Sequence, residues 1–323
     1  MTKFFTSIVI SFLLCVCLMY PWILLLRRLK FYPNVRNYLE HHRSKSAVPN
    51  LGGVIVFLSA FIVYAFLCKH YNVRVFFVLG IFFTLFLLGL YDDVRKYYTR
   101  GAAGLSARSK FVIQIVVAFT FCILLRVYDD AFSTFCYVPF LGCSVDFGVM
   151  TLFLSIGAIV SSANAVNITD GLDGLATLPV IFSFSSLIVI ACSHHGINFI
   201  SREEAIIFSS YIGSCFGFLV FNYSPAKIFL GDCGSLSLGG GIAALSIITQ
   251  NQLAMIIVCG IFVIETASVI IQIIYFRYTG KRIFLMSPLH HHFEKKGIEE
   301  RKIVIGFWIA AFVFAVFGAS VTM

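Results

Sequence analysis

Long apolar segments separated by short polar loops run along the whole chain. Segments close to the length that crosses a bilayer, about 20 residues each, fall at 6–26, 51–68, 73–90, 111–128, 146–163, 175–193, 204–221, 235–249, 252–276 and 303–321. This pattern predicts an all-α integral membrane protein with about ten transmembrane helices. The eighth segment is short and contains Gly239, Gly240 and Gly241 in a row. We expect these glycines to serve close helix packing.

Composition supports the membrane assignment. Of the 323 residues, 59% are hydrophobic and only 12% are charged, which is far from the balance of a soluble domain. The first apolar segment follows Lys3 but shows no small-residue cleavage site before Arg27, so we expect a retained helix rather than a signal peptide. A single polytopic domain over residues 1–323 is the simplest account.

Basic residues are distributed unequally between the two sets of alternating loops. If the helices alternate in direction, one side carries Arg27, Arg28, Lys30, Arg36, Arg43, Lys45, Arg95, Lys96, Arg100, Arg108, Lys110, Lys227, Arg277, Lys281, Arg282, Lys295, Lys296, Arg301 and Lys302. The other side carries Lys3, Lys69, Arg74, Arg126 and Arg202. Because cytoplasmic loops are enriched in Lys and Arg, this asymmetry places the basic loops in the cytoplasm and both termini on the periplasmic side.

The net charge of +9 therefore describes loop orientation and attraction to anionic lipid or substrate. The basic residues are dispersed among loops separated by apolar spans, so they form no nucleic-acid footprint. We expect membrane lipid as a partner, and no nucleic acid.

The segment 164–176 places polar side chains between two apolar spans. A carboxamide and carboxylate row recurs there at every third residue: Asn164, Asn167, Asp170 and Asp173. On helical or turn-rich backbone these residues lie near one face and can grip a ligand or a cation. The alternative is a hydrated turn in which Asn and Asp cap helix ends, with Gly171 and Gly174 allowing positive φ.

Two adjacent carboxylates, Asp92 and Asp93, directly follow the third predicted helix, and Lys96 lies one turn further on. Like charges repel, and a helix C-terminus disfavours negative charge. A cation or a proton-transfer role would explain the pair. The alternative is an interfacial salt-bridge cluster with Lys96.

A third acidic position, Asp232, lies between Gly231 and Gly234 before the eighth predicted helix. The glycines would let backbone and carboxylate approach a ligand or metal closely. The sequence is not a Walker loop, because GxxxxGK[ST] is absent. Ser235 could contact the ligand or simply cap the helix.

Three consecutive histidines, His290 to His292, occupy the last basic loop. Because they cannot all point one way on a helix, a three-histidine zinc site from this run is geometrically poor. Each imidazole could instead bond a phosphate or hold a neighbouring Asp, and the alternative is an exposed polar loop. Glu265 and Gln272 lie inside the apolar segment 252–276, where ionisable groups are functional candidates by default.

The first basic loop places Arg43 and Lys45 ahead of Gly52 and Gly53. Cationic side chains near a glycine-rich helix start could cradle a phosphate. They could equally be ordinary positive-inside residues.

As a set, these motifs resemble one family, the polyprenyl-phosphate N-acetylhexosamine-1-phosphate transferases (glycosyltransferase family 4). The likeness extends from about His42 to Gly297, and its motifs occur in the family's order: Asp92 to Lys96; Gly104, Leu105, Lys110 and Gln114; Asn164 to Ala176; Asn222 to Ser235; and His290 to Glu294. The ending Pro-Leu-His-His-His-Phe-Glu favours the muramoyl-pentapeptide branch. The family's HxxKxGTPTMGG loop is altered here, with Ala47, Val48, Asn50 and Leu51 at four of its positions, so only Lys45 is carried over from that loop.

This resemblance implies a reaction and its partners. Such an enzyme moves phospho-MurNAc-pentapeptide from UDP-MurNAc-pentapeptide to undecaprenyl phosphate, releases UMP and requires Mg²⁺. It works on the cytoplasmic face of the bacterial inner membrane, and the family suggests a homodimer. The implied metal ligand is Asp232. The implied catalytic residues are Asp92, Asp93, Asp232 and His291, with Asp92 positioning or deprotonating the lipid phosphate.

The resemblance also implies substrate-binding residues. Those expected at phosphates are Lys45, Lys96, Lys110, His291 and His292, and His290 is expected at the substrate without a stated group. Those expected at the nucleotide or at other polar groups are Asn164, Asn167, Asp170, Asp173, Asn222, Ser235, Gln272 and Phe229, the last as a stacking surface for uracil.

Two alternatives stay open at this point. A sister transferase would take UDP-GlcNAc as donor. An ion-coupled transporter would use Glu265 and the carboxylate row to coordinate a moving ion, although the sequence shows no two-fold repeat of motifs.

Overall fold

The computed structural model describes residues 2–32, 48–68, 70, 72–99, 104–129, 133–193 and 200–323. Within this part of the chain the elements are α1 (Thr2–Arg28), α2 (Gly52–Leu67), α3 (Val73–Tyr98), α4 (Ala107–Tyr128), β1 (Phe135–Val138), β2 (Cys143–Asp146), α5 (Met150–Thr169), α6 (Thr177–Ser193), α7 (Arg202–Asn222), α8 (Gly231–Ile248), α9 (Gln252–Val258), α10 (Gly260–Thr279), α11 (Leu289–Lys295) and α12 (Glu300–Ser320). Lys45, one of the predicted phosphate contacts, lies outside the described residues.

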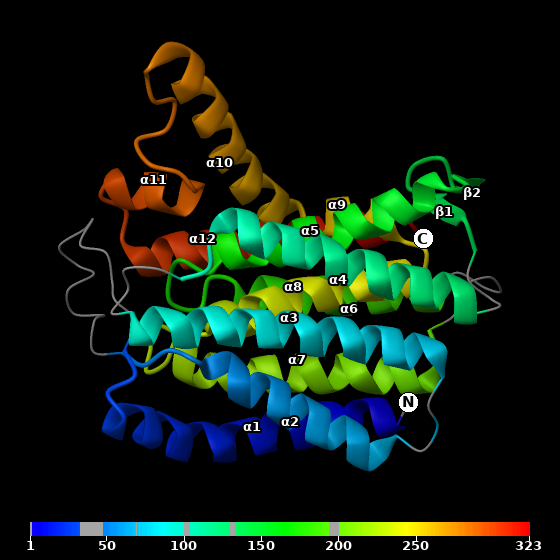
Figure 1. The fold of residues 1–323 in the computed structure, drawn as a ribbon, viewed down its shortest axis with the longest axis horizontal. Helices are drawn as coiled ribbons and strands as arrows, with labels where there is room; N and C mark the ends of the chain where they lie inside the picture. Colours follow the sequence, from blue (N-terminus) through cyan, green and yellow to red (C-terminus); the bar gives the residue numbers. More distant parts are fainter. Residues whose placement is uncertain are drawn as a thin grey trace.

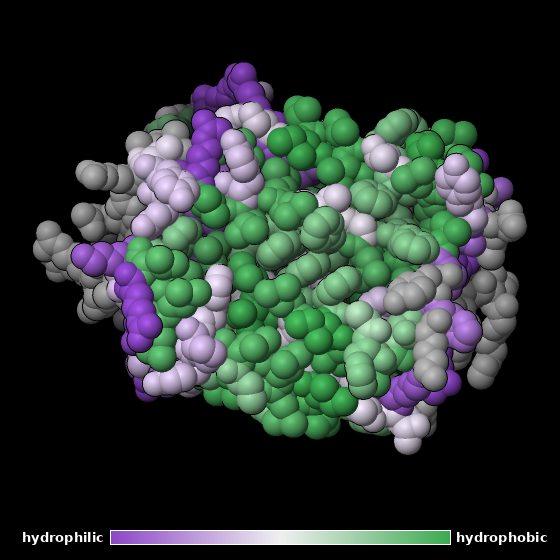
Figure 2. Space-filling view, turned by 60° about the horizontal axis from the view of Figure 1, so that its bottom comes forward, coloured by the Kyte–Doolittle hydropathy of each residue, from purple (hydrophilic) through white to green (hydrophobic). Residues whose placement is uncertain are grey.

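The helices have the length and apolar character of an integral membrane protein. Eight of those in the described residues, 18 to 27 residues long, are long and apolar enough to cross a bilayer, and α2 and α6 are shorter apolar helices. A broad apolar face occupies the middle of the molecule, with polar side chains gathered toward its two ends (Figure 2). This confirms the predicted all-helical membrane class. Both termini lie at the end of the bundle away from α11 (Figure 1).

Helix α8 forms the centre of the bundle and packs against α3 and α5. Its glycines permit the close approach: a Cβ at Gly239 would overlap the backbone of α5 at Ser162. Side chains of α3 fill the space beside the next two glycines, where a Cβ on Gly241 would overlap the ring of Phe82. The prediction that this glycine run serves close helix packing is confirmed.

Helices α3 and α5 extend beyond the ends that the apolar pattern predicted, and this places polar motifs inside them. Helix α3 continues to Tyr98, so Asp92 and Asp93 lie inside it rather than after it. Helix α5 continues to Thr169 and carries the first half of the polar row. Polar side chains did not end these helices because they are paired with groups on neighbouring elements, which removes the cost of burying them.

The single helix predicted over 252–276 was wrong, because the chain breaks at Cys259 into α9 and α10. Gly260 opens α10 directly against α12, where a Cβ would overlap the Phe314 ring. From that break α10 projects away from the other helices, and α11 lies beside it (Figure 1).

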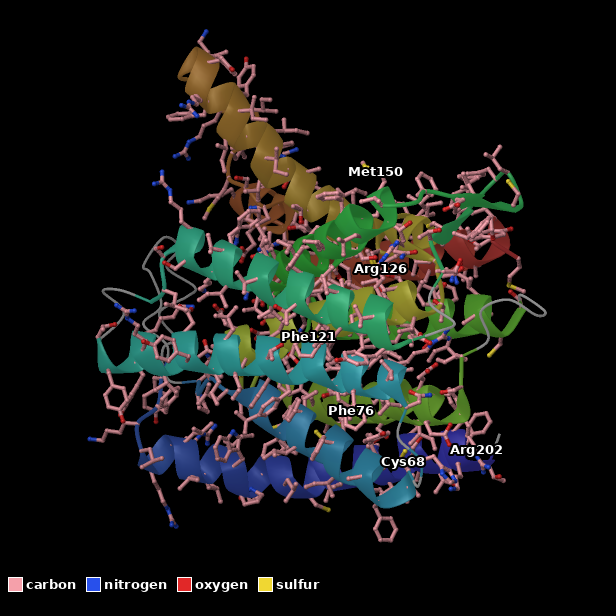
Figure 3. All side chains as sticks on the ribbon, turned by 45° about the vertical axis from the view of Figure 1, so that its right-hand side comes forward. Cys68, Phe76, Phe121, Arg126, Met150 and Arg202 are labelled. Carbon is pink, nitrogen blue, oxygen red and sulfur yellow. The ribbon has the colours of Figure 1, made fainter. Side chains whose placement is uncertain are left out.

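A small antiparallel hairpin, β1–β2, was not predicted. Tyr137 ties it to the turn after α8, donating its backbone N–H to Gln250 O at 3.0 Å. Cys68, after α2, and Arg202, opening α7, lie toward the same end of the bundle as this hairpin (Figure 3). The motif-bearing loops lie at the other end.

Candidate active site

Two carboxylates from different helices are bridged by two lysines. Lys110 Nζ lies 2.7 Å from Asp92 Oδ2 and 2.6 Å from Asp232 Oδ2. Lys96 Nζ lies 2.6 Å and 3.1 Å from the same two oxygens. Asp92 also accepts the backbone N–H of Leu105. Two motifs far apart in the sequence therefore meet as one charged cluster.

Local geometry explains why these four groups meet. Asp92 and Lys96 are one helical turn apart on α3, a spacing that places them on one face. Gly89, one turn earlier, lies against the start of α8, because a Cβ there would overlap the Asp232 carbonyl. The Asp92 side chain is fully buried and that of Asp232 is 15% exposed, so the opposite charges attract in a poorly solvated setting.

Asp93 has a different environment from Asp92. Its Oδ2 accepts the backbone N–H of Cys233 at 3.0 Å, and its Oδ1 accepts from Asn50 Nδ2 at 3.2 Å. It is only 3% exposed. Asp93 thus holds the first turn of α8, whose unpaired backbone N–H groups favour a carboxylate.

The polar row contributes Asn167 to the charged cluster. Its Nδ2 donates to Asp232 Oδ1 at 3.0 Å and to Ser235 Oγ at 2.8 Å. Ser235 is not the helix cap, because α8 begins at Gly231 and the Ser235 hydroxyl donates to Gly231 O. Asn164, one turn earlier on α5, donates instead to Gln114 Oε1 at 2.6 Å.

The loop 170–176 follows α5 and carries the rest of the row. Burial raises the pKa of Asp170 to about 8, and the nearby carboxylates Asp232, Asp93 and Asp173 add to the rise. Asp173 is buried, and its Oδ2 accepts the backbone N–H of Ala226 at 2.9 Å. Asp170 therefore interacts electrostatically with the charged cluster. Asp173 instead stabilises the loop between α7 and α8 through its bond to Ala226.

Asn222 and Phe229 also stabilise the loop between α7 and α8. Asn222 is buried, donates to Ile228 O at 3.0 Å and accepts from Thr177 Oγ1 at 3.3 Å. Phe229 pairs through its backbone with the segment before α2: its N–H donates to Pro49 O at 2.9 Å, and its O accepts from Gly52 N at 2.8 Å. Its ring is half-buried.

The histidine run forms a short helix, α11, rather than a loop, and its side chains take separate partners. His290 is fully buried, with Nδ1 2.7 Å from Glu265 Oε2. Burial lowers the pKa of His290, while Glu265 acts in the opposite direction. His291 Nδ1 contacts Glu294, and His292 Nδ1 accepts the Leu285 N–H at 3.1 Å.

Gln272 lies near α11 but makes a structural contact. Its Oε1 accepts the backbone N–H of Phe284 at 2.9 Å. Together with the bond between Glu265 and His290, this contact ties the segment that follows α10 back onto that helix.

Comparison with known proteins shows which family the chain belongs to. A family model described as glycosyl transferase family 4 matches residues 75–250. A phospho-N-acetylmuramoyl-pentapeptide-transferase of Rickettsia massiliae (strain Mtu5) is 41% identical over 293 residues, which cover 87% of this chain and 81% of that relative. The chain belongs to glycosyl transferase family 4. Relatives of the same name in Rickettsia akari (strain Hartford) and Rickettsia montanensis are 41% and 40% identical over the same length.

The segment matched to glycosyl transferase family 4 contains the charged cluster, including Asp92, Lys110 and Asp232. It ends before α10, α11 and α12. Helix α11, which carries the histidines, and its partner Glu265 therefore lie beyond the segment that matches the family model.

For this family 4 member, the side chains of the charged cluster can be compared with the ligands that a cation needs. Among the described residues no group of three or more His, Cys, Asp and Glu side chains could hold a metal ion. Carboxyl groups nevertheless outnumber ammonium groups in the cluster: Asp92, Asp93 and Asp232 gather near Lys96 and Lys110. Mg²⁺ commonly binds one or two carboxylates plus substrate phosphates, so this excess of carboxyls with Asp232 at its edge fits that ion.

Sequence reasoning missed several side chains that shape the site of this family 4 member. Asn50 was noted only as a departure from the family loop, yet it donates to Asp93. Glu300 and Trp308 of α12 bond the backbone of the loop 170–176. They belong to no motif, and only the tertiary fold brings α12 to that loop.

Proposed function

We propose that this chain transfers phospho-MurNAc-pentapeptide from UDP-MurNAc-pentapeptide to undecaprenyl phosphate, giving undecaprenyl-pyrophosphoryl-MurNAc-pentapeptide and UMP. The main structural support for this proposal is the charged cluster, in which Lys96 and Lys110 bridge the carboxylates of Asp92 and Asp232. The names and coverage of the relatives support the same reaction. A charged cluster at the end of a membrane helix bundle suits a reaction that joins a lipid phosphate to a nucleotide-linked sugar phosphate.

In the proposed reaction, an oxygen of the lipid phosphate attacks the sugar-linked phosphorus. A new phosphorus–oxygen bond forms, the bond from that phosphorus to the UMP oxygen breaks, and UMP leaves. Lys96 and Lys110 are placed to meet the phosphates, because both ammonium groups lie at the junction of the two carboxylates. Positioning and electrostatic stabilisation are the main requirements of such a transfer.

Asp92 would position the lipid phosphate or accept its proton. A phosphate monoester with a second pKa of about 6 is already mostly dianionic at neutral pH, so placement would matter more than basicity. Asp93 would assist by holding the start of α8 through Cys233. His291, on α11, is proposed to contribute to catalysis.

Mg²⁺ is the proposed cofactor, held by Asp232 together with substrate phosphates. When bound it would screen the anionic groups and stabilise the leaving UMP. The amide of Asn167 orients the Asp232 carboxylate through Oδ1. Asp170 would join the nucleotide-facing wall, with the Phe229 ring as the proposed stacking surface for uracil.

The cellular setting is also a proposal. We place the protein in the bacterial inner membrane as a multi-pass protein, with the charged cluster facing the cytoplasm, because the basic loops lie with it. Homodimer formation is proposed from the family resemblance.

The deciding experiment measures UMP release by purified protein given Mg²⁺, undecaprenyl phosphate and either UDP-MurNAc-pentapeptide or UDP-GlcNAc. We expect release with the first donor and its loss in the variant Asp232→Asn. Release only with UDP-GlcNAc would assign the sister activity instead. If neither donor yields UMP, the transferase proposal is lost, and ion flux through proteoliposomes would test the transporter alternative.

A further inference from the structure

The loop 170–176 is held from the C-terminal part of the chain at three points. Glu300 Oε1 accepts the backbone N–H of Asp173 at 2.9 Å. Trp308 Nε1 donates to the backbone carbonyl of Gly174 at 3.1 Å. The imidazole of His290 lies against Gly171, where a Cβ would overlap Nε2. Two of these partners come from α12 and one from α11.

The contacts of Glu300 and Trp308 satisfy backbone groups of the loop, which lie outside the hydrogen-bond ladder of any helix. The loop lies between the end of α5 and the start of α6, and Gly174 has a φ of +76°, a conformation that glycine adopts freely. Buried backbone N–H and C=O groups require partners, because an unpaired one costs about as much as a lost hydrogen bond. The shape of the loop therefore depends on side chains of another element.

Glu300 and Trp308 make contacts that their own helix does not need. An acidic side chain in the first turn of a helix usually interacts with that helix's own N-terminus, and Glu300 is in the first turn of α12. Its Oε1 reaches the loop and accepts the Asp173 N–H. Trp308 also packs against Tyr223, with ring centroids 5.8 Å apart, so the same side chain touches the segment that follows α7.

The other side of the loop faces the charged cluster. The loop directly follows the end of α5, where Asn167 donates to Asp232 Oδ1 at 3.0 Å and to Ser235 Oγ at 2.8 Å. Asp173 uses its carboxylate on Ala226 N. A shift of the loop would consequently move Asp170 relative to Asp232 and would disturb the segment leading into α8.

We propose that Glu300 and Trp308 are positioning residues, which hold the loop 170–176 in the conformation that binds the nucleotide part of the donor. This inference rests on the proposed transferase function. Both residues bond the backbone of the loop, so each can act on the site through the loop. The effect of removing either contact should fall on the nucleotide donor and not on the lipid acceptor.

The test compares Michaelis constants for the two substrates in Glu300→Ala and Trp308→Phe. Because each variant loses one hydrogen bond to the loop, we expect KM for UDP-MurNAc-pentapeptide to rise about five- to tenfold. KM for undecaprenyl phosphate should stay within about twofold of the parent, as a lost loop contact predicts. Glu300→Gln should restore a near-parental donor KM, since its amide oxygen can still accept the Asp173 N–H.

Two matched controls exist in the chain. Glu299, the neighbouring acid, is exposed and pairs only weakly with Lys302 at 3.7 Å, so Glu299→Ala should leave both constants unchanged. Trp22 is the other of the two tryptophans and donates to Leu51 O, so Trp22→Phe controls for loss of an indole. A donor KM in Glu300→Ala equal to that of Glu299→Ala, or an equal rise in both constants, would overturn the proposal.

A tryptophan-fluorescence titration tests the positioning role separately from the proposed transferase function. In a Trp22→Phe background Trp308 is the sole tryptophan, and its emission should shift when UMP is added. Glu300→Ala should weaken UMP binding in the same titration by about five- to tenfold. Parental protein that releases no UMP from any donor would refute the proposed function, whereas unchanged Trp308 emission or unchanged UMP affinity would refute the positioning role.

Discussion

Glu265 holds His290 at two points, one on the imidazole and one on the backbone. Its Oε2 lies 2.7 Å from Nδ1, and its Oε1 accepts the His290 backbone N–H at 3.1 Å. Both side chains are fully buried. Because both carboxylate oxygens act as acceptors, the imidazole proton is placed on Nδ1. The remaining nitrogen, Nε2, is directed toward Gly171.

We expect Glu265→Gln to lower turnover about tenfold or more, since a neutral amide replaces the carboxylate that accepts from the buried imidazole. The glutamine amide can donate to Nδ1 and would favour the tautomer with the proton on Nε2. UMP release measures the effect, and ¹⁵N shifts of labelled imidazoles report the tautomer. The double variant with His290→Gln should be no worse than the worse single variant.

The control for that prediction is Glu204→Gln, which removes a buried carboxylate that caps the start of α7. It should lower thermal stability with little change in turnover. Fully additive losses in the Glu265 and His290 double variant would show that the two side chains act independently.

The two bridging lysines should differ in importance. Lys110 is 17% exposed and lies within 2.7 Å of both carboxylates, whereas Lys96 is 42% exposed and lies 3.1 Å from Asp232. Solvent screens the more exposed ion pair more strongly. We expect Lys110→Met to reduce UMP release by about tenfold more than Lys96→Met, with both variants assayed at equal folded concentration. Equal losses would mean that both ammonium groups act mainly on substrate rather than on the carboxylate pair.

The sequence predicted the class of fold because apolar segment length is a local property. The residue pattern also singled out Asp92, Lys96 and Asp232, and the family resemblance added Lys110; the structure brings these four together. The sequence could not show that Asp92 and Asp93 face different partners, because adjacent residues on a helix point about 100° apart and meet different elements.

Tertiary contacts explain most of what the sequence did not reveal. Helix α10 separates from α9 where Gly260 meets Phe314 of α12, a contact with no local sequence signal. Glu300 lies outside every motif, and its role depends on α12 reaching the loop 170–176. The hairpin β1–β2 has strands of 4 residues each, too short to stand out by alternation.

The raised pKa of Asp170 predicts a pH-dependent stability of the protein without ligands. The native state holds a proton on this carboxyl up to about pH 8, whereas an unfolded Asp releases it near its ordinary pKa of about 4. The Asp170 contribution to stability is therefore complete below about pH 4 and is lost as the pH rises toward 8.

Thermal unfolding in detergent across that pH range checks this prediction. Asp170→Asn cannot titrate, so its unfolding temperature should fall less than that of the parent as the pH rises. Asp146→Asn is a matched control in the exposed hairpin, where a hydrogen bond from Thr134 lowers the pKa of the carboxyl. A parental slope unchanged by Asp170→Asn would assign the pH dependence to other groups.

Asn222 offers a way to separate structural from substrate-binding polar residues. Its side chain is buried, with Nδ2 donating to Ile228 O and Oδ1 accepting from Thr177. Asn222→Ala would leave the Ile228 carbonyl unpaired and should cost about 1–3 kcal/mol of stability. If its hydrogen bonds serve only the fold, the folded fraction should keep a donor KM close to that of the parent. A large rise in donor KM with unchanged thermal stability would instead make Asn222 a direct substrate contact, as the family resemblance implies.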